Sequence, residues 1–381
     1  RLYPTPFKAS VSRLQQFVLC PFAHLVRYGL GPRERKVFAV EAPDIGELFH
    51  NVLLAFAGQL EKRGMSWPDL DRQTCTQLVD EVMDELVPSS GGGVFASTFR
   101  YRYLVNRLKR VSRRSVWTLT QHLTRGDFKP HGHEVSFGGG GDLPPLVVEL
   151  ANGQVMYLEG RIDRIDLLEE SGQTYVKVMD YKSGVQPFSL SDVYHGLALQ
   201  LLIYMKAVLA GTDPNQNPWK PGGAFYFRID DPMISCDERV VEEVESRLFK
   251  EFRMKGLALK DMRVVSAMDS HIEGSSEILP LGVTKQGDFS RTSSVLSEEE
   301  FQALIEHVDA LLRKIATEIL AGSSRIAPVK ADKMTACQYC RYREICQFDQ
   351  VFPDNRYREI RHLKDEEVIQ AITGAAGEVR E

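Results

Sequence analysis

The segment that most constrains the fold runs from residue 160 to residue 184 and reads GRIDRIDLLEESGQTYVKVMDYKSG. Two runs of strand-forming residues flank the dipeptide Ser171-Gly172, which is typical of a tight hairpin turn. With the turn centred between these two residues, Asp163 lies directly opposite Asp180, and Lys182 lies two residues further along the same face. Like charges that face each other across a hairpin destabilise the sheet unless a cation lies between them. The segment therefore predicts a hairpin that brings two carboxylates and one amine together.

A hard divalent cation such as Mg²⁺ suits this arrangement, because it binds carboxylate oxygens and retains waters that a phosphate can replace. Such an ion polarises a phosphoryl oxygen and activates water. The Lys182 ammonium is then placed to orient that water or to stabilise charge that develops on the phosphate. On spacing alone, the alternative is a solvent-facing hairpin edge with an ordinary Lys–Asp ion pair. The pattern leaves both interpretations open.

Two helical patterns elsewhere in the chain offer further polar groups. In GELFH, Gly46 and His50 are four residues apart and share one helix face. The glycine predicts a close approach by another backbone segment, and His50 is a candidate metal ligand. In QLLIY, Gln200 and Tyr204 also share one helix face, where they suit phosphate or base contacts. The alternatives are a core or surface histidine and a buried hydrogen-bonded pair.

Four motifs occur in the order Gly46-x-x-x-His50, GRIDRID, DYKSG and Gln200-x-x-x-Tyr204. Taken together and in this order, they resemble the motifs of the RecB-like branch of the PD-(D/E)XK nucleases. The resemblance implies that Asp163 and Asp180 bind a catalytic Mg²⁺ ion together with His50. It also implies that Lys182 is the catalytic lysine, and that the glutamine and tyrosine of the last motif position DNA near the metal.

The same resemblance suggests roles for neighbouring residues. The backbone carbonyl of Tyr181 is a further candidate metal ligand, and Glu134 in HGHEVSFGG matches a further acidic position. Asp166 has no catalytic counterpart, so we expect it to form an ion pair with Arg161 or Arg164. The fold implied is a PD-(D/E)XK (restriction-endonuclease-like) α/β core, with a central mixed sheet flanked by helices.

The cysteines form a second pattern. Cys337, Cys340 and Cys346 lie close together near the end of the chain, and Cys20 is the natural fourth thiolate. Thiolates select zinc or an iron–sulfur cluster, and their chemistry alone does not separate the two. One early cysteine followed by a late Cys-x-x-Cys-x(5)-Cys is similar to the iron–sulfur staple of AddB-type nuclease domains. That resemblance implies a 4Fe-4S cluster that clamps both ends of the sequence and closes the helical additions to the core.

The segment FRYRYLVNRLKRVSRRSVW at residues 99–117 carries seven arginine or lysine residues and no acidic residue. Such a helix can neutralise phosphates without reading sequence, and Tyr101 or Tyr103 can stack on bases. A solvated helix face is the alternative. The candidate nucleic-acid contacts are Arg102, Arg107, Lys109, Arg110 and Arg113.

The order of patterns predicts helices, then a strand meander, then a helix, a strand and further helices. The predicted helices cover residues 10–28, 43–60, 69–87, 99–123, 190–210 and 297–321, and the predicted strands lie within 146–182 and 224–229. We expect a helical part at 1–130, the nuclease core at 131–330 and a cysteine-bearing segment at 331–381.

Composition limits the remaining choices. The 381 residues are 43% hydrophobic and 26% charged, as in a globular protein, and the net charge is −5. The sequence contains no apolar run long enough to predict a membrane span and no signal-peptide pattern, so we expect a cytoplasmic protein. The first residue is Arg1 rather than Met, which suggests a piece of a longer polypeptide. No P-loop motif occurs, so ATP hydrolysis would need a partner.

The function expected is that of a Mg²⁺-dependent DNA nuclease module of an AddAB-type helicase–nuclease that acts in double-strand-break repair. The family resemblance implies an AddA-type partner protein and cleavage of the 5′-terminated strand. Two alternatives remain open. One is a stand-alone iron–sulfur exonuclease of phage or CRISPR-adaptation type, and the other is a DNA clamp that does not cut.

Overall fold

The computed structural model describes residue 3 and residues 6–32, 38–211, 217–234, 241–332, 334–353 and 355–378. The N-terminal residue and Cys236 lie outside the described residues. The helices are α1 (Val11–Leu19), α2 (Pro21–His24), a π-helical turn η1 (Leu25–Leu30), α3 (Ala42–Arg63), α4 (Arg72–Leu86), α5 (Phe99–Leu123), α6 (Leu190–Tyr194), α7 (Gln200–Leu209), α8 (Val241–Glu251), α9 (Met262–Ser266), α10 (Glu298–Leu320), α11 (Arg343–Cys346) and α12 (Asp365–Glu378), with 3-10 turns η2 (Trp67–Asp69) and η3 (Ser90–Ala96).

A six-stranded mixed sheet forms the centre of the molecule, with the order β2-β5-β6-β7-β8-β9. Strands β2, β5 and β6 are antiparallel, β6 and β7 run parallel, and β8 pairs antiparallel with β7 and parallel with β9. This confirms the predicted mixed sheet flanked by helices. The strands are β2 (Lys129–Phe137), β5 (Gly160–Glu170), β6 (Gln173–Lys182), β7 (Lys220–Arg228), β8 (Lys255–Leu259) and β9 (Val295–Leu296).

The predicted hairpin register is confirmed between β5 and β6. The paired residues run from Glu170↔Gln173 at the turn to Arg164↔Met179. Asp163 and Asp180 are the next two residues in this register and are therefore opposite each other. Ser171 and Gly172 both have positive φ angles, of 52° and 77°, as the tight turn requires.

The predicted continuous meander is wrong at one point, because its strands belong to two sheets. Strand β4 (Val155–Leu158) pairs with β3 (Leu146–Glu149) and with β1 (Phe7–Ala9) in a separate three-stranded sheet. The chain changes sheets at Gly160, where a Cβ would lie only 2.7 Å from the Phe137 ring. The glycine permits this close approach.

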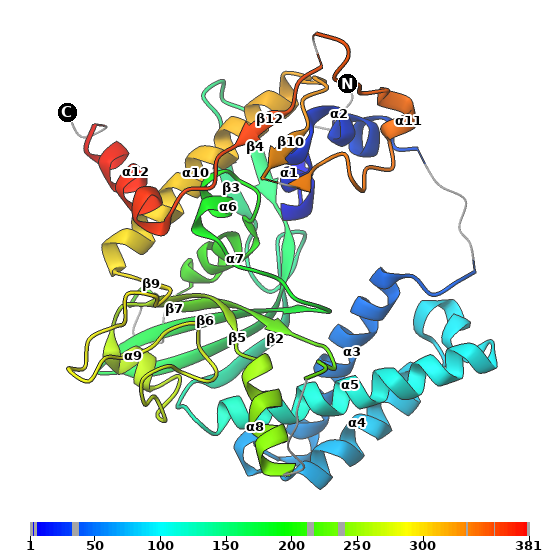
Figure 1. The fold of residues 1–381 in the computed structure, drawn as a ribbon, viewed down its shortest axis with the longest axis vertical. Coiled ribbons are helices and arrows are strands. Elements are labelled where there is room, and N and C mark those ends of the chain that lie inside the picture. The colour runs from blue at the N-terminus through cyan, green and yellow to red at the C-terminus, as the bar shows by residue number, and fades with distance from the viewer. Residues whose placement is uncertain are drawn as a thin grey trace.

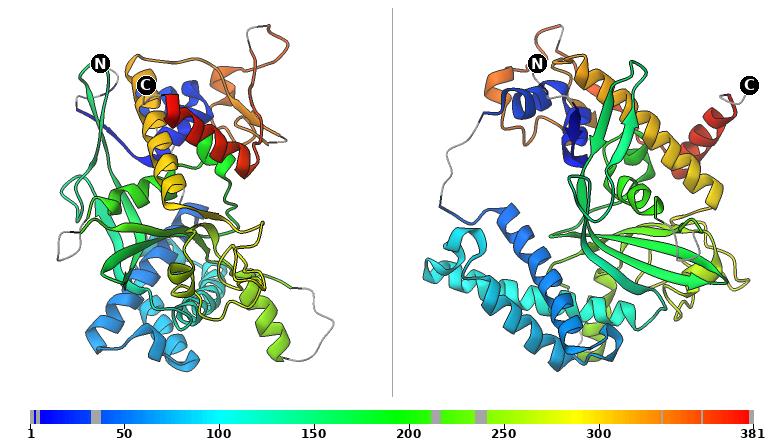
Figure 2. Two further views of the ribbon diagram at one scale, coloured as in Figure 1. Left: turned by 90° about the vertical axis from the view of Figure 1, so that its left-hand side faces the viewer. Right: turned by 180° about the vertical axis from the view of Figure 1, so that it is seen from behind.

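Helices cover both faces of the central sheet in two layers (Figure 1). Helices α3, α4 and α5 pack on one face and share a hydrophobic core with Met179 and Tyr181 of β6. On the other face, where Val176 and Val178 point, α7 packs on the sheet and α10 packs on α7. Helices α1 and α12 pack in turn on α10 and belong to the same hydrophobic core. Figure 2 shows the same two layers from the side and from behind. The alternation of β6 side chains between the two cores explains why this strand is apolar over most of its length.

Several predicted helices are confirmed, and others differ in detail. The capping box Ser297–Glu300 begins α10 as predicted. The helix predicted at 190–210 is instead two helices, because Gly196 adopts a φ of 78° and ends α6. Helix α8 and strand β8 were not predicted, nor was β2, whose sequence KPHGHEVSF lacks a clear apolar alternation.

A third small sheet, β11-β10-β12, lies in the cysteine-bearing part of the chain. Its strands are β10 (Val329–Ala331), β11 (Met334–Thr335) and β12 (Arg358–Ile360). Helix α11 lies beside α2 in all views, so segments from opposite ends of the sequence are neighbours (Figures 1 and 2). Among the described residues, no helix combines the length and the apolar character that a bilayer crossing requires.

Candidate active site

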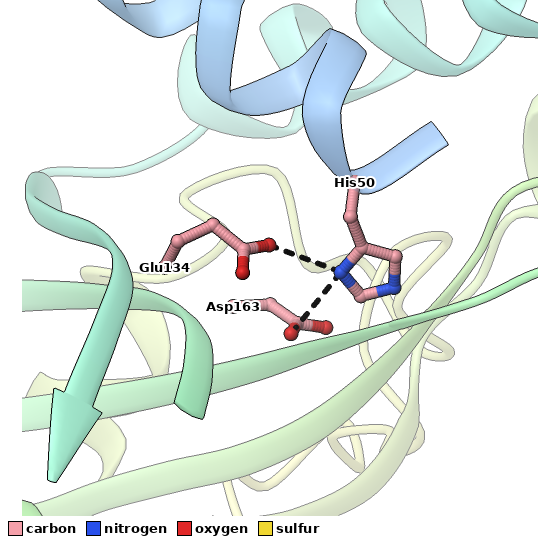
Figure 3. A group of neighbouring side chains, drawn as sticks. All are labelled: His50, Glu134 and Asp163. Atoms are coloured by element: carbon pink, nitrogen blue, oxygen red, sulfur yellow. Dashed lines mark hydrogen bonds and ion pairs between the residues drawn. The ribbon is translucent and has the colours of Figure 1, made fainter. Parts of the chain in front are cut away.

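Three candidate metal ligands from three elements converge at one end of the central sheet (Figure 3). His50 Nδ1, on α3, lies 3.1 Å from Glu134 Oε1 of β2 and 3.2 Å from Asp163 Oδ1 of β5. One ligand atom from each of these residues lies within 4.8 Å of the others. The carboxylates are 11% and 7% exposed, so both are largely withdrawn from water. This group is the part of the described structure best suited to hold a cation.

Glu134 is one of the three grouped candidate ligands, although its sequence pattern gave only a weak indication of this role. The pairs His133↔Arg164 and Val135↔Ile162 flank it, so Glu134 lies opposite Asp163. Its φ of 52° is rare for a residue with a side chain, and such local strain is common at functional sites. Because Asp163 in turn lies opposite Asp180, acidic residues occupy three adjacent strands in one row. The only sequence signal for this strand was its HGHE polar run.

The ionisation of His50 reflects its two acidic neighbours. Burial lowers the pKa of His50, but hydrogen bonds and charges from Asp163 and Glu134 outweigh it and raise the pKa to about 10. In the absence of a cation, an imidazolium ion therefore balances the carboxylates. Asp163 also accepts a hydrogen bond from the Tyr181 backbone amide at 2.6 Å, which fixes its orientation toward β6.

Asp180 lies beside this group and is held by Lys182 of its own strand and by Gln200 of α7, in the other helix layer. Lys182 Nζ is 2.5 Å from Asp180 Oδ2, and the Gln200 amide nitrogen donates to Asp180 Oδ1 at 2.7 Å. The ammonium of Lys182 donates to Gln200 Oε1 at 2.8 Å. The Gln200 amide also donates to Tyr204 Oη at 2.9 Å. The four residues, predicted from two separate motifs, thus form one connected network.

Burial and the charge of Asp163 together raise the pKa of Asp180 to about 7, although Lys182 and His50 act in the opposite direction. Asp180 is only 1% exposed. Its carboxylate is therefore poorly solvated at neutral pH, as expected for a group that needs an additional positive charge. Asp180 is not one of the three residues whose ligand atoms cluster within 4.8 Å, so the metal set expected from the sequence is only partly assembled in this structure.

Behind the site, a buried charged cluster supports the strands. Arg164 Nε donates to Asp166 Oδ1 at 2.6 Å, and Lys177 Nζ lies 2.9 Å from Asp166 Oδ2. The Arg164 guanidinium also lies 5.3 Å from the centre of the Trp67 ring. The expected pairing of Asp166 with Arg164 is confirmed. The predicted close backbone approach at Gly46 is wrong, because a Cβ there would meet only the Ser183 hydroxyl, at 3.9 Å.

The four cysteines of the predicted cluster come from the N-terminus of α2 and from the segment around α11. All four are free thiols. Burial raises the pKa of the Cys337 thiol, and the nearby thiols of Cys20, Cys340 and Cys346 raise it further. These sulfur atoms therefore lie within electrostatic range of one another. Within the described residues they do not form a ligand group as tight as the one around His50.

The basic helix is α5, and its cations are of two kinds. Lys109 and Arg113 form ion pairs with Asp84 and Asp80 of α4, so they join the two helices. The guanidinium of Arg102 stacks on Phe99 at 4.0 Å. The remaining candidates, Arg107 and Arg110, are exposed, and Arg110 pairs with Asp231 at 2.8 Å. Prediction from charge alone could not separate helix-joining cations from outward-facing ones.

Known proteins match almost the whole chain. Residues 8–347 match the family model described as the PD-(D/E)XK nuclease superfamily. A protein of Alkaliphilus metalliredigens, named as a subunit of an ATP-dependent helicase/deoxyribonuclease, is 50% identical over 97% of this chain and 32% of its own length. Proteins of the same name from Caldanaerobacter subterraneus and Clostridium tetani are 43% and 41% identical, over 94% and 98% of this chain and 31% and 32% of their own lengths.

The chain spans about a third of the length of these relatives. The family model, by contrast, covers most of the chain and includes every residue of the candidate site. The fold agrees with this match, since a mixed sheet between helices carries the acidic residues and the lysine on adjacent strands. The chain therefore belongs to the PD-(D/E)XK nuclease superfamily.

Proposed function

We propose that this chain is a divalent-cation-dependent deoxyribonuclease module that hydrolyses DNA phosphodiester bonds. The observation that carries the proposal is the convergence of His50, Glu134 and Asp163 beside the Asp180–Lys182 pair. A binding module would gain nothing from carboxylates buried in a row, because their desolvation is costly without a cation. A non-cutting clamp is therefore the weaker candidate.

The residues present fit a hard cation. Three carboxylates and one imidazole offer oxygen and nitrogen donors, and burial together with the neighbouring Asp163 charge raises the pKa of Asp180, so a bound cation would favour its ionised form. We propose that Asp163 and Asp180 hold Mg²⁺, with His50, Glu134 and the Tyr181 carbonyl as additional ligands. When bound, such a cation polarises a phosphoryl oxygen and makes water more acidic.

The chain's own side chains supply the remaining functions. Lys182 Nζ is fixed between Asp180 and Gln200, so its ammonium can stabilise negative charge on a phosphate or orient the attacking water. Gln200 bonds to both members of the pair and to Tyr204, and we propose it as a positioning residue. Tyr204 is only 7% exposed, so we propose that it acts mainly through Gln200.

The named relatives support a place in a larger machine. Their name describes a subunit of an ATP-dependent helicase/deoxyribonuclease, and this chain matches a third of their length. We propose that the chain is the nuclease part of an AddB-type protein of this kind, with an AddA-type helicase–nuclease partner in double-strand-break processing. Cleavage of the 5′-terminated strand is part of this proposal and follows from the family resemblance alone.

We also propose that Cys20, Cys337, Cys340 and Cys346 hold a 4Fe-4S cluster. The four thiols lie within electrostatic range but are not packed within 4.8 Å of one another. Thiolates bind either zinc or an iron–sulfur cluster, and the choice of a cluster in this proposal follows from the family resemblance. A cluster here would close the fold rather than take part in hydrolysis.

The test is a cleavage assay on linear DNA with Mg²⁺, using the parent, Lys182→Ala, Asp180→Ala and Lys220→Ala. Lys220 is also an ion-paired lysine of the central sheet, but its partner is Glu298, away from the site, so it serves as the matched control. We expect the parent and Lys220→Ala to cut equally, and the other two variants to lose about a hundredfold or more of the activity. Equal cutting by all four would remove Lys182 and Asp180 from the mechanism. Tight DNA binding without cutting would favour the clamp.

A further inference from the structure

A row of aromatic and arginine side chains, here called the outer row, follows one face of α5; it is exposed at the N-terminal end and half-buried at Arg114 and Trp117. Its members recur every three or four residues and so share one helix face; they are Phe99, Tyr103, Arg107, Arg110, Arg114 and Trp117. The opposite face buries Val105, Leu108 and Ser115 in the core. Because α5 has 25 residues, it is about 37 Å long, and this outer row extends along most of it.

The N-terminal end of the outer row exposes two large aromatic rings. Phe99 is 82% exposed and Tyr103 is 76% exposed. Between them in sequence, Arg102 stacks its guanidinium on the Phe99 ring. Nearby, the Tyr101 hydroxyl accepts a hydrogen bond from the Val40 amide just before α3, the helix that carries His50. Exposed rings next to arginines are the elements with which proteins stack unpaired bases.

The other end of the outer row lines a cavity of about 420 Å³ between α4, α5 and α8. Arg110, Arg114 and Trp117 contribute to its wall, together with Arg72 and Arg125. Each of these cations has an acidic neighbour, such as Glu245 for Arg72. The volume is within the range of small-ligand sites, and the combination of one indole with several guanidinium groups suits a base and its phosphate.

One contact shows that the outer row already holds an anion. The carboxylate of Asp231 lies between two arginines, 2.8 Å from Arg110 Nε and 3.3 Å from Arg114 Nε. A DNA phosphate presents oxygens that can engage the same pair of guanidinium groups. The two guanidinium groups are therefore placed so that a single anionic group can contact both.

We propose that the outer row of α5 is a binding track for single-stranded DNA, an inference that rests on the proposed nuclease function. The phosphates lie along Arg107, Arg110 and Arg114. The bases stack on Phe99 and Tyr103 at one end and on Trp117 in the cavity at the other. Double-stranded DNA would contact only the arginines, because its bases are already stacked on each other and cannot stack on the aromatic rings.

The experiment measures binding of fluorescent oligothymidylate by anisotropy in EDTA, so that cleavage plays no part. Phe99→Ala/Tyr103→Ala should weaken binding on the order of tenfold without altering its dependence on salt. Arg110→Ala/Arg114→Ala should reduce the slope of log affinity against log salt by about 0.7 for each arginine lost. Arg110→Lys/Arg114→Lys should retain the slope. Phe352→Ala and Arg63→Ala, exposed residues elsewhere, serve as matched controls.

Asp231→Asn should act in the opposite direction and strengthen binding several-fold, because it frees two guanidinium groups for phosphate. Asp84→Asn removes the same charge from the pair with Lys109, off the outer row, and should leave affinity nearly unchanged. This pair of variants separates a local effect from a change in net charge.

The proposal is overturned if the aromatic and arginine variants bind oligothymidylate like the controls. It is also overturned if the aromatic variants lose duplex and single-strand affinity equally, since the row would then be a general phosphate surface. A parallel cleavage assay on the parent keeps the two questions apart. A parent that binds as expected but does not cut would contradict the proposed function and leave the track in place.

Discussion

At the scale of single residues, Asp180 has the most unusual environment in the site. Its carboxyl is buried and lies opposite the Asp163 carboxyl, and these two effects raise its pKa to about 7. The sequence register placed the two side chains opposite each other. It could not show that Gln200 and Lys182 would share the Asp180 oxygens, because those contacts depend on how α7 packs on β6.

The raised pKa of Asp180 predicts that this residue destabilises the metal-free protein at high pH. The folded pKa of about 7 lies above the reference value of 3.8. The contribution of Asp180 to the free energy of unfolding is therefore fully present below pH 3.8 and is lost as the pH rises from there through 7. Asp180→Asn should therefore raise the free energy of unfolding in EDTA at pH 8 by ~2–4 kcal/mol. Denaturant unfolding at pH 4 and pH 8 measures this. An equal difference between parent and variant at both pH values would contradict the assignment.

His50 gives a second prediction. Its pKa of about 10 means that the imidazole is protonated at mildly alkaline pH in the metal-free protein, yet only a neutral imidazole can coordinate a metal. Binding of Mg²⁺ should therefore release about one proton. Calorimetric titration in two buffers of different ionisation enthalpy reads the number of protons directly. At pH 9, where Asp180 is already ionised, His50→Gln should bind more weakly and release none, and identical heats for the parent in both buffers would exclude His50 as a ligand.

At the scale of elements, the site depends on where strands change partners. Gly160 marks the change from the β1-β4-β3 sheet to the central sheet, three residues before Asp163. A side chain at this position would press against the buried Phe137 ring. The start of β5, and hence the position of Asp163, is therefore sensitive to this one residue.

Gly160→Ala should lower the free energy of unfolding by ~1–3 kcal/mol, because the Cβ would lie 2.7 Å from the Phe137 ring, which is only 1% exposed. Gly58→Ala is the matched control, since nothing lies within 4 Å of its Cβ position in α3. That variant should gain ~0.5–1 kcal/mol from helix propensity. Thermal or urea unfolding distinguishes the two, and a stabilised Gly160→Ala variant would contradict the packing described.

The sequence predicted the elements that carry strong local signals. The Ser171-Gly172 turn, the capping box of α10 and the long helix α5 all formed as expected. Strand β2 was missed because Pro130 and Gly132 interrupt its pattern, and its register indeed shifts between them. With β2 missing, Glu134 could be reached only through the family resemblance. Pairing between distant strands leaves no local pattern, so the three-strand acidic row could not be predicted.

At the scale of the whole molecule, the cysteine-bearing segment joins distant parts of the sequence. An Arg358 guanidinium nitrogen donates to the Val18 carbonyl, and just before this segment the Arg325 carbonyl accepts from the Phe22 amide at 3.1 Å. A cluster held by all four cysteines would close a loop that contains most of the chain. Cross-links of this kind restrict the unfolded chain, although measured stabilisation correlates only weakly with loop length.

Cys20→Ser should therefore lose bound iron and sulfide and lower the melting temperature at the same time. Cys75→Ser is the control: Cys75 is 1% exposed in α4, so this variant should lose stability but retain iron. Iron, sulfide and zinc analysis of anaerobically purified protein, with calorimetry, tests both. Stoichiometric zinc without iron in the parent would replace the cluster by a zinc site.

The candidate site at the end of the sheet connects both helix layers. His50 belongs to the layer of α3, whereas Gln200, which orients Asp180, belongs to the layer of α7. Each layer has a hydrophobic interior of its own. A bound ion would link the α3 layer to the α7 layer through His50, Asp180 and Gln200. Its binding free energy would therefore stabilise the packing of the two layers on each other. Chelation should accordingly increase hydrogen exchange first at the α3 end that faces β5, while both interiors stay protected.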